Sequence, residues 1–229
     1  MLIKTQAIAL SYIKYKETSI IAKIFTRDLG LKSYIINGVR SKGGQSKIAF
    51  YQPLSLLDLV VYEKKGGGLQ RISETKMLHT PVRIPFDFPR MGISLFLTEV
   101  ISKSIHEDYQ NESLFDFLYQ SILHLDSTRV RIGHFPLIFL VNQAKYLGFS
   151  PEKGKGFFTE SLGQPFIAEE LVEVIDFLED ALRSGFGTTK VLAKTSRQTL
   201  MDHLLDFYSL QLGQEFVWKT MPILRQVMS

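Results

Sequence analysis

The stretch SIIAKIFTRDLGLKSYII, residues 19–36, contains two segments of strand-like sequence separated by a turn. Both segments, Ser19 to Thr26 and Leu31 to Ile36, are rich in Ile, Ala, Phe and Tyr and partly alternate apolar with polar residues. Such alternation is typical of strands with one face in a core. The intervening Arg27-Asp28-Leu29-Gly30 has turn chemistry. We therefore predict that the N-terminal part of the chain is β-structure.

Three further strands are predicted around this pair, at Lys4–Ser11, Leu54–Tyr62 and Leu69–Lys76. Turn-like residues separate them, including a glycine triplet at 66–68, and a longer, polar and basic segment spans 38–53. Five short strands with one longer connection after the third fit a small closed barrel of the OB type. An open five-stranded sheet would give the same pattern, so the sequence leaves both open.

The pattern changes near residue 80, where Pro81, Pro85 and Pro89 predict a linker. Beyond it, apolar residues recur every three or four positions, which indicates amphipathic helices over roughly 92–106, 112–125, 135–147, 169–183 and 195–212. Asn111 is placed to cap the second helix, and Gly148 to end the third. We thus expect an α+β protein with an OB-fold domain over 1–80 and a helical domain over 81–229. Residues 148–168, rich in glycine and proline, are expected to form an irregular insertion.

The composition excludes several classes of protein. The 229 residues are 45% hydrophobic and 22% charged, as in ordinary globular proteins, and they include no cysteine. Disulfides, thiolate nucleophiles and thiolate-bound metals are therefore impossible. The densest apolar run, Phe135 to Val141, is far too short to cross a bilayer. The cytoplasm is the expected location, without membrane contact, although the absence of cysteine excludes no compartment by itself.

Positive charge is concentrated in the N-terminal part. Residues 1–80 hold 13 Lys/Arg and 5 Asp/Glu, a net +8, whereas residues 81–229 hold 14 and 18, a net −4. This asymmetry predicts a polyanionic partner for the barrel, although a solvated basic face that serves only solubility is the alternative. The candidate DNA-binding residues are the cations between positions 14 and 47: Lys14, Lys16, Lys23, Arg27, Lys32, Arg40, Lys42 and Lys47.

Aromatic residues are interleaved with these cations, namely Tyr12, Tyr15, Tyr34, Phe50 and Tyr51. Phosphate pairing by cations and base stacking on exposed rings are what single-stranded nucleic acid requires. The competing interpretation is that the rings fill the barrel interior, which we expect for about half of them.

No catalytic constellation is evident. The segment Gly38–Lys47 lacks the Gly-Lys-Ser/Thr order of a phosphate-binding loop, and the five histidines are too scattered to form a metal site. The sequence therefore predicts a protein that is not an enzyme and that uses no cofactor or metal.

An ordered series of short motifs resembles RecO, the family of bacterial recombination mediators. The motifs that carry the resemblance run along nearly the whole chain: Glu17-Thr18-Ser19, Ile24 to Gly30, Asn37-Gly38-Val39-Arg40, Gln52-Pro53-Leu54, Leu57 to Tyr62, Phe96 to Val100, Asn111 to Phe115, Leu147 to Pro151, Arg197 to Leu200 and Phe207 to Leu212.

The resemblance implies an N-terminal OB-fold, a helical body and a small zinc-ribbon-like insertion. It also implies binding to single- and double-stranded DNA, annealing of complementary strands, and action with RecR to load RecA onto DNA coated by single-stranded DNA-binding protein (SSB), whose acidic C-terminal tail is a further partner. Many members carry four cysteines in the insertion. Residues 149–168 contain neither cysteine nor histidine, so zinc cannot be held there in that way. Phe157, Phe158, Leu162 and Phe166 are expected to stabilise the insertion by apolar packing instead.

The leading hypothesis is thus a non-catalytic DNA-binding mediator of recombinational repair. The alternative is an interaction module whose barrel binds an acidic protein and contacts DNA only weakly. A small nuclease is the third possibility, and the sequence lacks the clustered carboxylates that would hold two metal ions.

Overall fold

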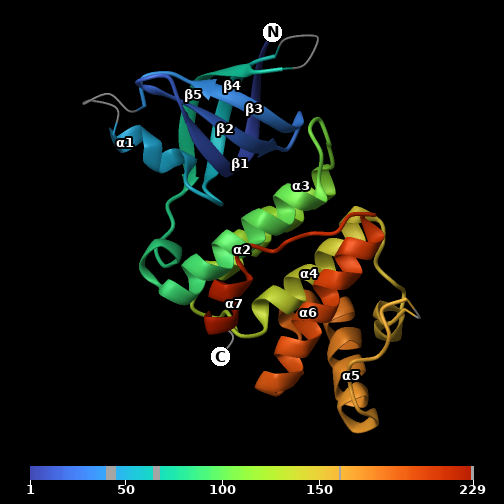
Figure 1. Ribbon diagram of the computed structural model, residues 1–229. Coiled ribbons are helices and arrows are strands. Elements are labelled where there is room, and N and C mark those ends of the chain that lie inside the picture. Colours follow the sequence, from blue (N-terminus) through green and yellow to red (C-terminus); the bar gives the residue numbers. More distant parts are fainter. Residues whose placement is uncertain (40–44, 64–67, 160, 228–229) are drawn as a thin grey trace. The chain divides into compact units, whose positions relative to one another are not determined.

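The computed structural model describes residues 1–39, 45–63, 68–159 and 161–227. By contacts within the chain it divides into two compact units (Figure 1). Unit 1 comprises Met1–Phe86 with Leu97–Asp126, and unit 2 comprises Asp87–Phe96 with Ser127–Ser229. The division at residue 80 that the sequence suggested stays a prediction.

Unit 1 is built on a closed five-stranded barrel. Its strands are β1 (Leu2–Tyr15), β2 (Ser19–Thr26), β3 (Gly30–Ile36), β4 (Leu56–Tyr62) and β5 (Gln70–His79). Their order around the barrel is β1-β2-β3-β5-β4, and all neighbours are antiparallel except β3 and β5. The predicted OB-type barrel is confirmed, and the open sheet is not what forms.

The barrel interior takes one side of each strand. On β2, Ile20, Ala22 and Ile24 are fully buried in this core, and their register partners Tyr34 and Ala9 on the adjacent strands point to the same side. Small residues here leave room for the larger ones, so the interior is filled by side chains. The alternate residues of the same strands consequently face outward.

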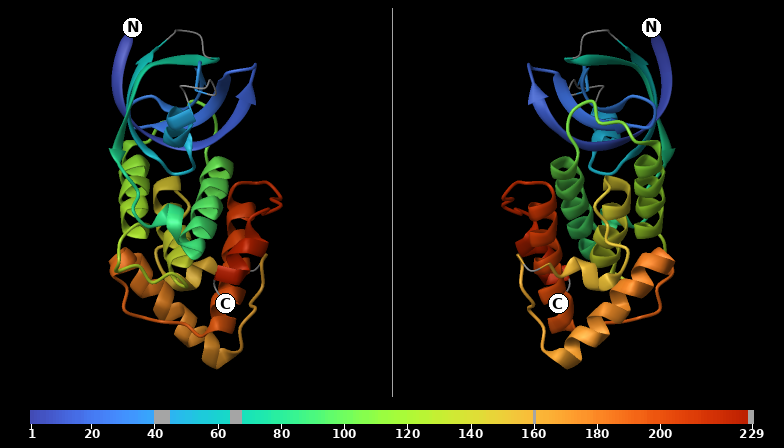
Figure 2. Two further views of the ribbon diagram at one scale, coloured as in Figure 1. Left: turned by 90° about the vertical axis from the view of Figure 1, so that its left-hand side faces the viewer. Right: turned by 90° about the vertical axis from the view of Figure 1, so that its right-hand side faces the viewer.

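Two short helical segments follow β3 in the connection for which the sequence predicts only a polar, basic loop. The helix α1 (Gln45–Ile48) leads into a 3-10 turn, η1 (Ala49–Tyr51). Figures 1 and 2 show α1 beside the barrel. Tyr51 is buried in the barrel core, and its hydroxyl lies 2.7 Å from Thr75 Oγ1 on β5, which anchors the turn.

One outer side of the barrel is covered by the helical part of unit 1. The helix α3 (Glu112–Leu125) places Phe115 against Phe25 of β2, with ring centroids 5.9 Å apart. At the start of β3, Gly30 has a φ of +71°, and an added methyl group would collide with the carbonyl oxygen of Tyr109. Asn111 caps α3 by accepting from the N–H of Leu114, which confirms the predicted cap.

The proline-rich connection is shorter than the sequence suggested. After a 3-10 turn, η2 (Ile84–Phe86), the helix α2 already begins at Phe88 and runs to Ser104. Pro89 was expected in the linker, but it lies in the first turn of α2. A proline at this position removes no helical hydrogen bond, because the first N–H groups of a helix have no partner within the helix.

Unit 2 is helical. It contains the start of α2, then α4 (Phe135–Leu147), η3 (Gly154–Phe157), α5 (Ala168–Ser184), η4 (Gly185–Gly187), α6 (Lys194–Gln211) and α7 (Met221–Val227). Gly148 ends α4 in the left-handed conformation at φ +85°, as predicted. The helix α7 was not predicted. It packs beside Gly92 of α2, where an added methyl group would overlap Val227 and meet Ile223.

The irregular insertion is held by aromatic packing of Phe157, Phe158 and Phe166, as the sequence predicted for these three residues. Phe157 is fully buried with its ring 5.1 Å from that of Phe207 on α6. Phe158 packs between Phe166, at 6.0 Å, and the imidazole of His203, which it stacks on at 4.6 Å. His203 Nε2 also lies 3.1 Å from the carbonyl oxygen of Phe157, so the insertion and α6 are tied together.

A buried histidine makes unit 2 sensitive to acid. The N–H of Leu192 donates to His134 Nε2 at 3.0 Å, which requires a neutral ring. Burial, and then the charges of Arg197 and Arg131, lower the pKa of His134 to about 4. Because this pKa lies below its unfolded value of about 6.5, the stability it contributes is present above pH 6.5 and is lost as pH falls toward 4.

We expect unit 2 to lose about 1 to 2 kcal/mol of unfolding free energy between pH 7 and pH 5 from this group. Urea unfolding followed by Trp218, the single tryptophan of the chain, measures it in unit 2. His134→Gln keeps an acceptor but removes the titration, so its pH dependence should be shallower. Burial also lowers the pKa of His203, which leaves a residual dependence. An unchanged slope in the Gln variant would contradict the assignment.

Candidate nucleic-acid interface

The outer side of the barrel is divided into a covered and an uncovered part. Ile8, Phe25 and Leu31 lie side by side on β1, β2 and β3 and are fully buried. Two positions further along the strands, Lys23 is only half-buried between Ser11 and Ser33. The next row, Ile13, Ile21 and Ile35, is likewise exposed or half-buried. We call this uncovered part the open face, and it consists of Ser11, Ile13, Tyr15, Ile21, Lys23, Ser33 and Ile35.

The open face follows from strand alternation. Because Ala22 points into the barrel, its neighbours Ile21 and Lys23 must point outward. Ile13, the register partner of Ile21, is 64% exposed. Exposed apolar side chains beside a cation offer contact area for bases as well as charge for phosphates. The outer surface of the second and third strands is also where OB-folds bind oligonucleotides.

Three of the sequence-predicted cations have no ion-pair partner among the residues that the structure describes. They are Lys14 at the end of β1, Lys23 on the open face and Lys47 in α1. Lys14 and Lys47 are exposed. Lys16 lies in the β1–β2 turn with its ammonium 5.4 Å from the ring of Tyr15. The open face and the β1–β2 turn are thus bordered by positive charge, and no described carboxylate forms an ion pair with Lys14, Lys23 or Lys47.

Two other predicted cations are engaged inside unit 1. Arg27 makes a bidentate contact with Asp116 of α3, at 3.0 and 3.2 Å, and a further ion pair with Glu112 at 3.2 Å. The hydrogen bond and charge of Asp116 raise the pKa of the Arg27 guanidinium above its usual value. Arg27 therefore attaches α3 to the barrel, and the carboxylates of Asp116 and Glu112 balance its charge.

Lys32 is similarly occupied. Its side chain is only 11% exposed, and its ammonium lies 2.8 Å from Glu63 and 3.4 Å from Asp108. Burial lowers the pKa of Lys32, but the hydrogen bonds and charges of Glu63 and Asp108 raise it by more, so the net shift is upward. The two remaining candidates, Arg40 and Lys42, lie outside the described residues.

The aromatic candidates separate into two groups. Tyr34 and Tyr51 are buried in the barrel core, as expected for about half of the set. Tyr15 is half-buried on the open face, and Phe50 is half-buried in η1. Tyr12 lies partly buried against the barrel core. Tyr12, Tyr15 and Phe50 are thus the partly exposed rings, and of these Tyr12 and Phe50 also pack against the barrel core.

Sequence reasoning missed Arg71, an exposed cation at the start of β5 that shares a pocket with Lys47. The glycine triplet before it marked a turn, but nothing local showed that β5 would run beside β3. Only the parallel pairing of Ile35 with Arg71 brings this cation to the same side as the 38–53 connection.

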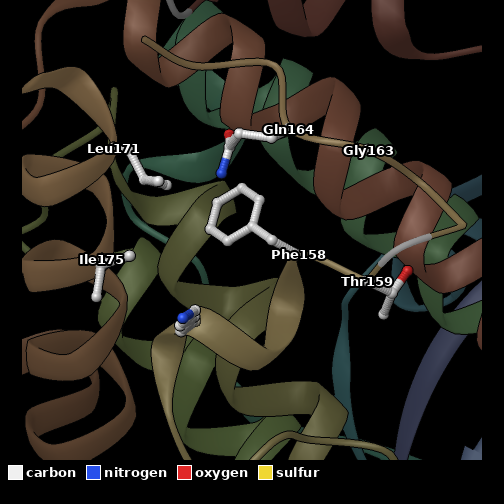
Figure 3. A pocket seen from close by; sticks show the side chains of 7 residues that line it. Phe158, Thr159, Gly163, Gln164, Leu171 and Ile175 are labelled. Carbon is white, nitrogen blue, oxygen red and sulfur yellow. The ribbon is translucent and has the colours of Figure 1, made fainter. Parts of the chain in front are cut away.

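A separate pocket lies in unit 2, against the insertion. Figure 3 shows Phe158 pointing into it, with Leu171 and Ile175 of α5 on one side and Gln164 on another. Its volume is about 290 Å³. The described residues include no group of three or more His, Asp or Glu side chains arranged to hold a metal ion. Nor is any described helix long and apolar enough to cross a membrane.

Known proteins resemble this chain over its whole length. The family model for the N-terminal part of recombination protein O matches residues 1–81, and the model for the C-terminal part matches residues 85–155. The DNA repair protein RecO of Flavobacterium psychrophilum is 37% identical, with all of both chains covered.

Two further relatives agree. The protein of the same name from Flavobacterium johnsoniae is 35% identical over all of both chains. That of Chlorobium phaeobacteroides is 34% identical over 66% of this chain and 58% of its own. Both family models match in order along the chain, and two relatives are at least 35% identical over the full length of both chains. The chain therefore belongs to the RecO family of DNA repair proteins.

Proposed function

We propose that this chain is a non-enzymatic recombination mediator that binds single- and double-stranded DNA through unit 1 and anneals complementary strands. The observation that supports it most directly is the open face with Lys14, Lys23 and Lys47 around the barrel, free of ion-pair partners among the described residues. Lys16, Arg40 and Lys42 belong to the proposed interface on sequence grounds. Arg27 and Lys32 contribute to the proposed interface by stabilising the fold of unit 1 through their ion pairs.

The proposed mechanism is charge neutralisation. Two bare strands repel one another, and a basic surface that holds one strand by its phosphates reduces the repulsion felt by the second. The bases must stay available for pairing, so lysine–phosphate contacts suit annealing better than contacts to base edges. A catalytic group is not needed for this, and neither is a cofactor.

The wider role is proposed from the family. With RecR, the chain helps to load RecA onto DNA coated by SSB, and it recognises the acidic C-terminal tail of SSB. We place this activity in the cytoplasm, at the nucleoid. The alternative of an interaction module that binds an acidic protein predicts weak DNA binding, and the following experiment separates the two.

We expect the purified chain to accelerate annealing of complementary single strands without ATP. If about four phosphates are neutralised, the logarithm of the binding constant falls with the logarithm of salt at a slope near −3. Raising salt from about 50 to 200 mM then weakens binding roughly fifty-fold, and annealing declines with it. A fluorescence annealing assay measures both. Strict ATP dependence, or no acceleration at any salt in this range, would remove the mediator proposal and favour the interaction module.

A further inference from the structure

The closed barrel is joined most narrowly between β3 and β5. The strands β3 and β5 are joined over only two residue pairs, Tyr34 with Gln70 and Ile35 with Arg71. Beyond these two pairs β3 and β5 are not paired with each other, and residues of α1 and η1 lie beside them. A pocket of about 270 Å³ remains between them, which we call the barrel-wall pocket.

The inner part of this pocket is apolar. Val39 and Tyr51 are buried in its wall and belong to the barrel core, and Ile36 and Ile72 pack against the same core. Phe50 of η1 also packs against this core, but it is only half-buried and lines the pocket, so part of the residue remains accessible from the pocket. Such a wall accepts a flat apolar group more readily than a solvated one.

The rim of the pocket is polar and positive. Ser73 and Asn37 are exposed at it and can donate or accept hydrogen bonds. Lys47 and Arg71 are also exposed there, one from α1 and the other from β5. No described carboxylate lines the pocket. The ligand that suits this arrangement has a flat ring for the wall and negative charge for the rim.

We propose that the barrel-wall pocket takes one unpaired nucleobase of the bound strand, stacked on Phe50, while Lys47 and Arg71 hold the flanking phosphates. This deepens the proposed function and rests on it. The volume of the pocket supports a single base, because pockets for small molecules range upward from about 300 Å³ and this pocket lies at the lower end of that range. Unpaired bases turned out of a strand are commonly stacked on aromatic rings and arginine planes in this way.

The consequence for annealing is a preference for unpaired strands. A base held in the pocket cannot be paired at the same time, so the pocket contributes affinity only while the strand is single. When the complement pairs with that base, the contribution is lost and the phosphate contacts alone remain. The product duplex is therefore held less tightly than the substrate strand, which promotes release.

The experiment compares two labelled single strands of equal length and charge: an oligothymidylate, and a strand built from stable abasic analogues. Titrations with the full chain measure the dissociation constant for each. We expect the abasic strand to bind roughly five- to tenfold more weakly, because it lacks the affinity that one stacked base contributes. The salt dependence should be the same for both strands, since their phosphates are equal.

Two pocket variants and one control complete the design. Ser73→Leu fills the rim of the pocket, and Phe50→Leu removes the ring while keeping an apolar side chain. Each variant should bind the oligothymidylate and the abasic strand with equal affinity. That affinity should match the affinity of the wild type for the abasic strand. Thr80→Leu makes an equivalent change at an exposed residue outside the pocket and should behave as the wild type.

The outcomes separate this inference from the proposed function. Equal binding of both strands by the wild type overturns the pocket assignment and leaves DNA binding intact. A base preference that persists in both pocket variants also overturns it, and assigns stacking to another ring such as Tyr15. Absence of binding to either strand would overturn the proposed function and the inference together.

Discussion

Reversing three charges at once, Lys14→Glu, Lys23→Glu and Lys47→Glu, should weaken single-strand binding about a hundredfold at ~0.1 M salt. Each lysine–phosphate contact contributes about 0.7 to the slope of log affinity against log salt on single strands. Three lost contacts reduce the slope by about 2, and at about 0.1 M salt this corresponds to about two decades of affinity. Fluorescence anisotropy titrations at several salt concentrations measure the affinity and the slope together.

A matched control makes the same change of charge in unit 2. Lys153, Lys155 and Lys194 are exposed there, and their replacement by Glu alters the net charge of the chain equally. We expect this control to bind DNA far more tightly than the unit 1 variant and to retain most of its salt slope. The thermal stability of both variants should change little, because exposed charges contribute little to it. Equal losses in the two variants would place the DNA-binding surface outside the barrel.

The second large effect concerns stability. Asp126, at the end of α3, has a side chain that is only 2% exposed and accepts four hydrogen bonds or ion-pair contacts. Its Oδ1 accepts from the N–H groups of Arg83 and Ile84, both at 2.8 Å. Its Oδ2 accepts from the N–H of Val82 and lies 2.9 Å from His79 Nε2. Burial raises the pKa of Asp126, but these hydrogen bonds lower it by more, so the carboxylate stays ionised.

Asp126→Ala should therefore cost about 3 kcal/mol of the unfolding free energy of unit 1, because it leaves one buried and two part-buried N–H groups without acceptors. Native-state hydrogen exchange on peptides from β5 and α3 measures the loss within that unit. Asp126→Asn retains Oδ1 but turns an NH₂ group toward the N–H of Val82, so its cost should be intermediate. A loss below about 0.5 kcal/mol in the Ala variant would show that residues 82–84 are held by other contacts.

The affinity of the folded Asp126→Ala variant for DNA should be close to that of the wild type. Neither Asp126 nor residues 82–84 belong to the open face, and they do not line the barrel-wall pocket. Comparing this variant with the charge-reversal variant thus separates damage to the fold from damage to the proposed interface.

Much of the fold was predictable because its signals are local. All five strands were predicted, β2 with its observed bounds, since residue alternation reports burial without knowledge of the partner strand. The cap at Asn111 and the helix end at Gly148 depend on a few adjacent residues. The α-helices missed were α1 and α7. Both are short, and their stability comes from packing on distant parts of their own units.

For the proposed interface, the sequence by itself determined the positive charge of the N-terminal part, and its motifs indicated the family. Tertiary structure alone decided how each cation is used. Arg27 meets Asp116 from 89 positions away, and Lys32 meets Glu63 from 31 positions away, so neither ion pair leaves a local trace. Arg71 joins Lys47 only through the pairing of β5 with β3. The physical reason is that charge is a property of each residue, whereas its neutralisation depends on which distant residues the strand order and register bring within a few ångströms.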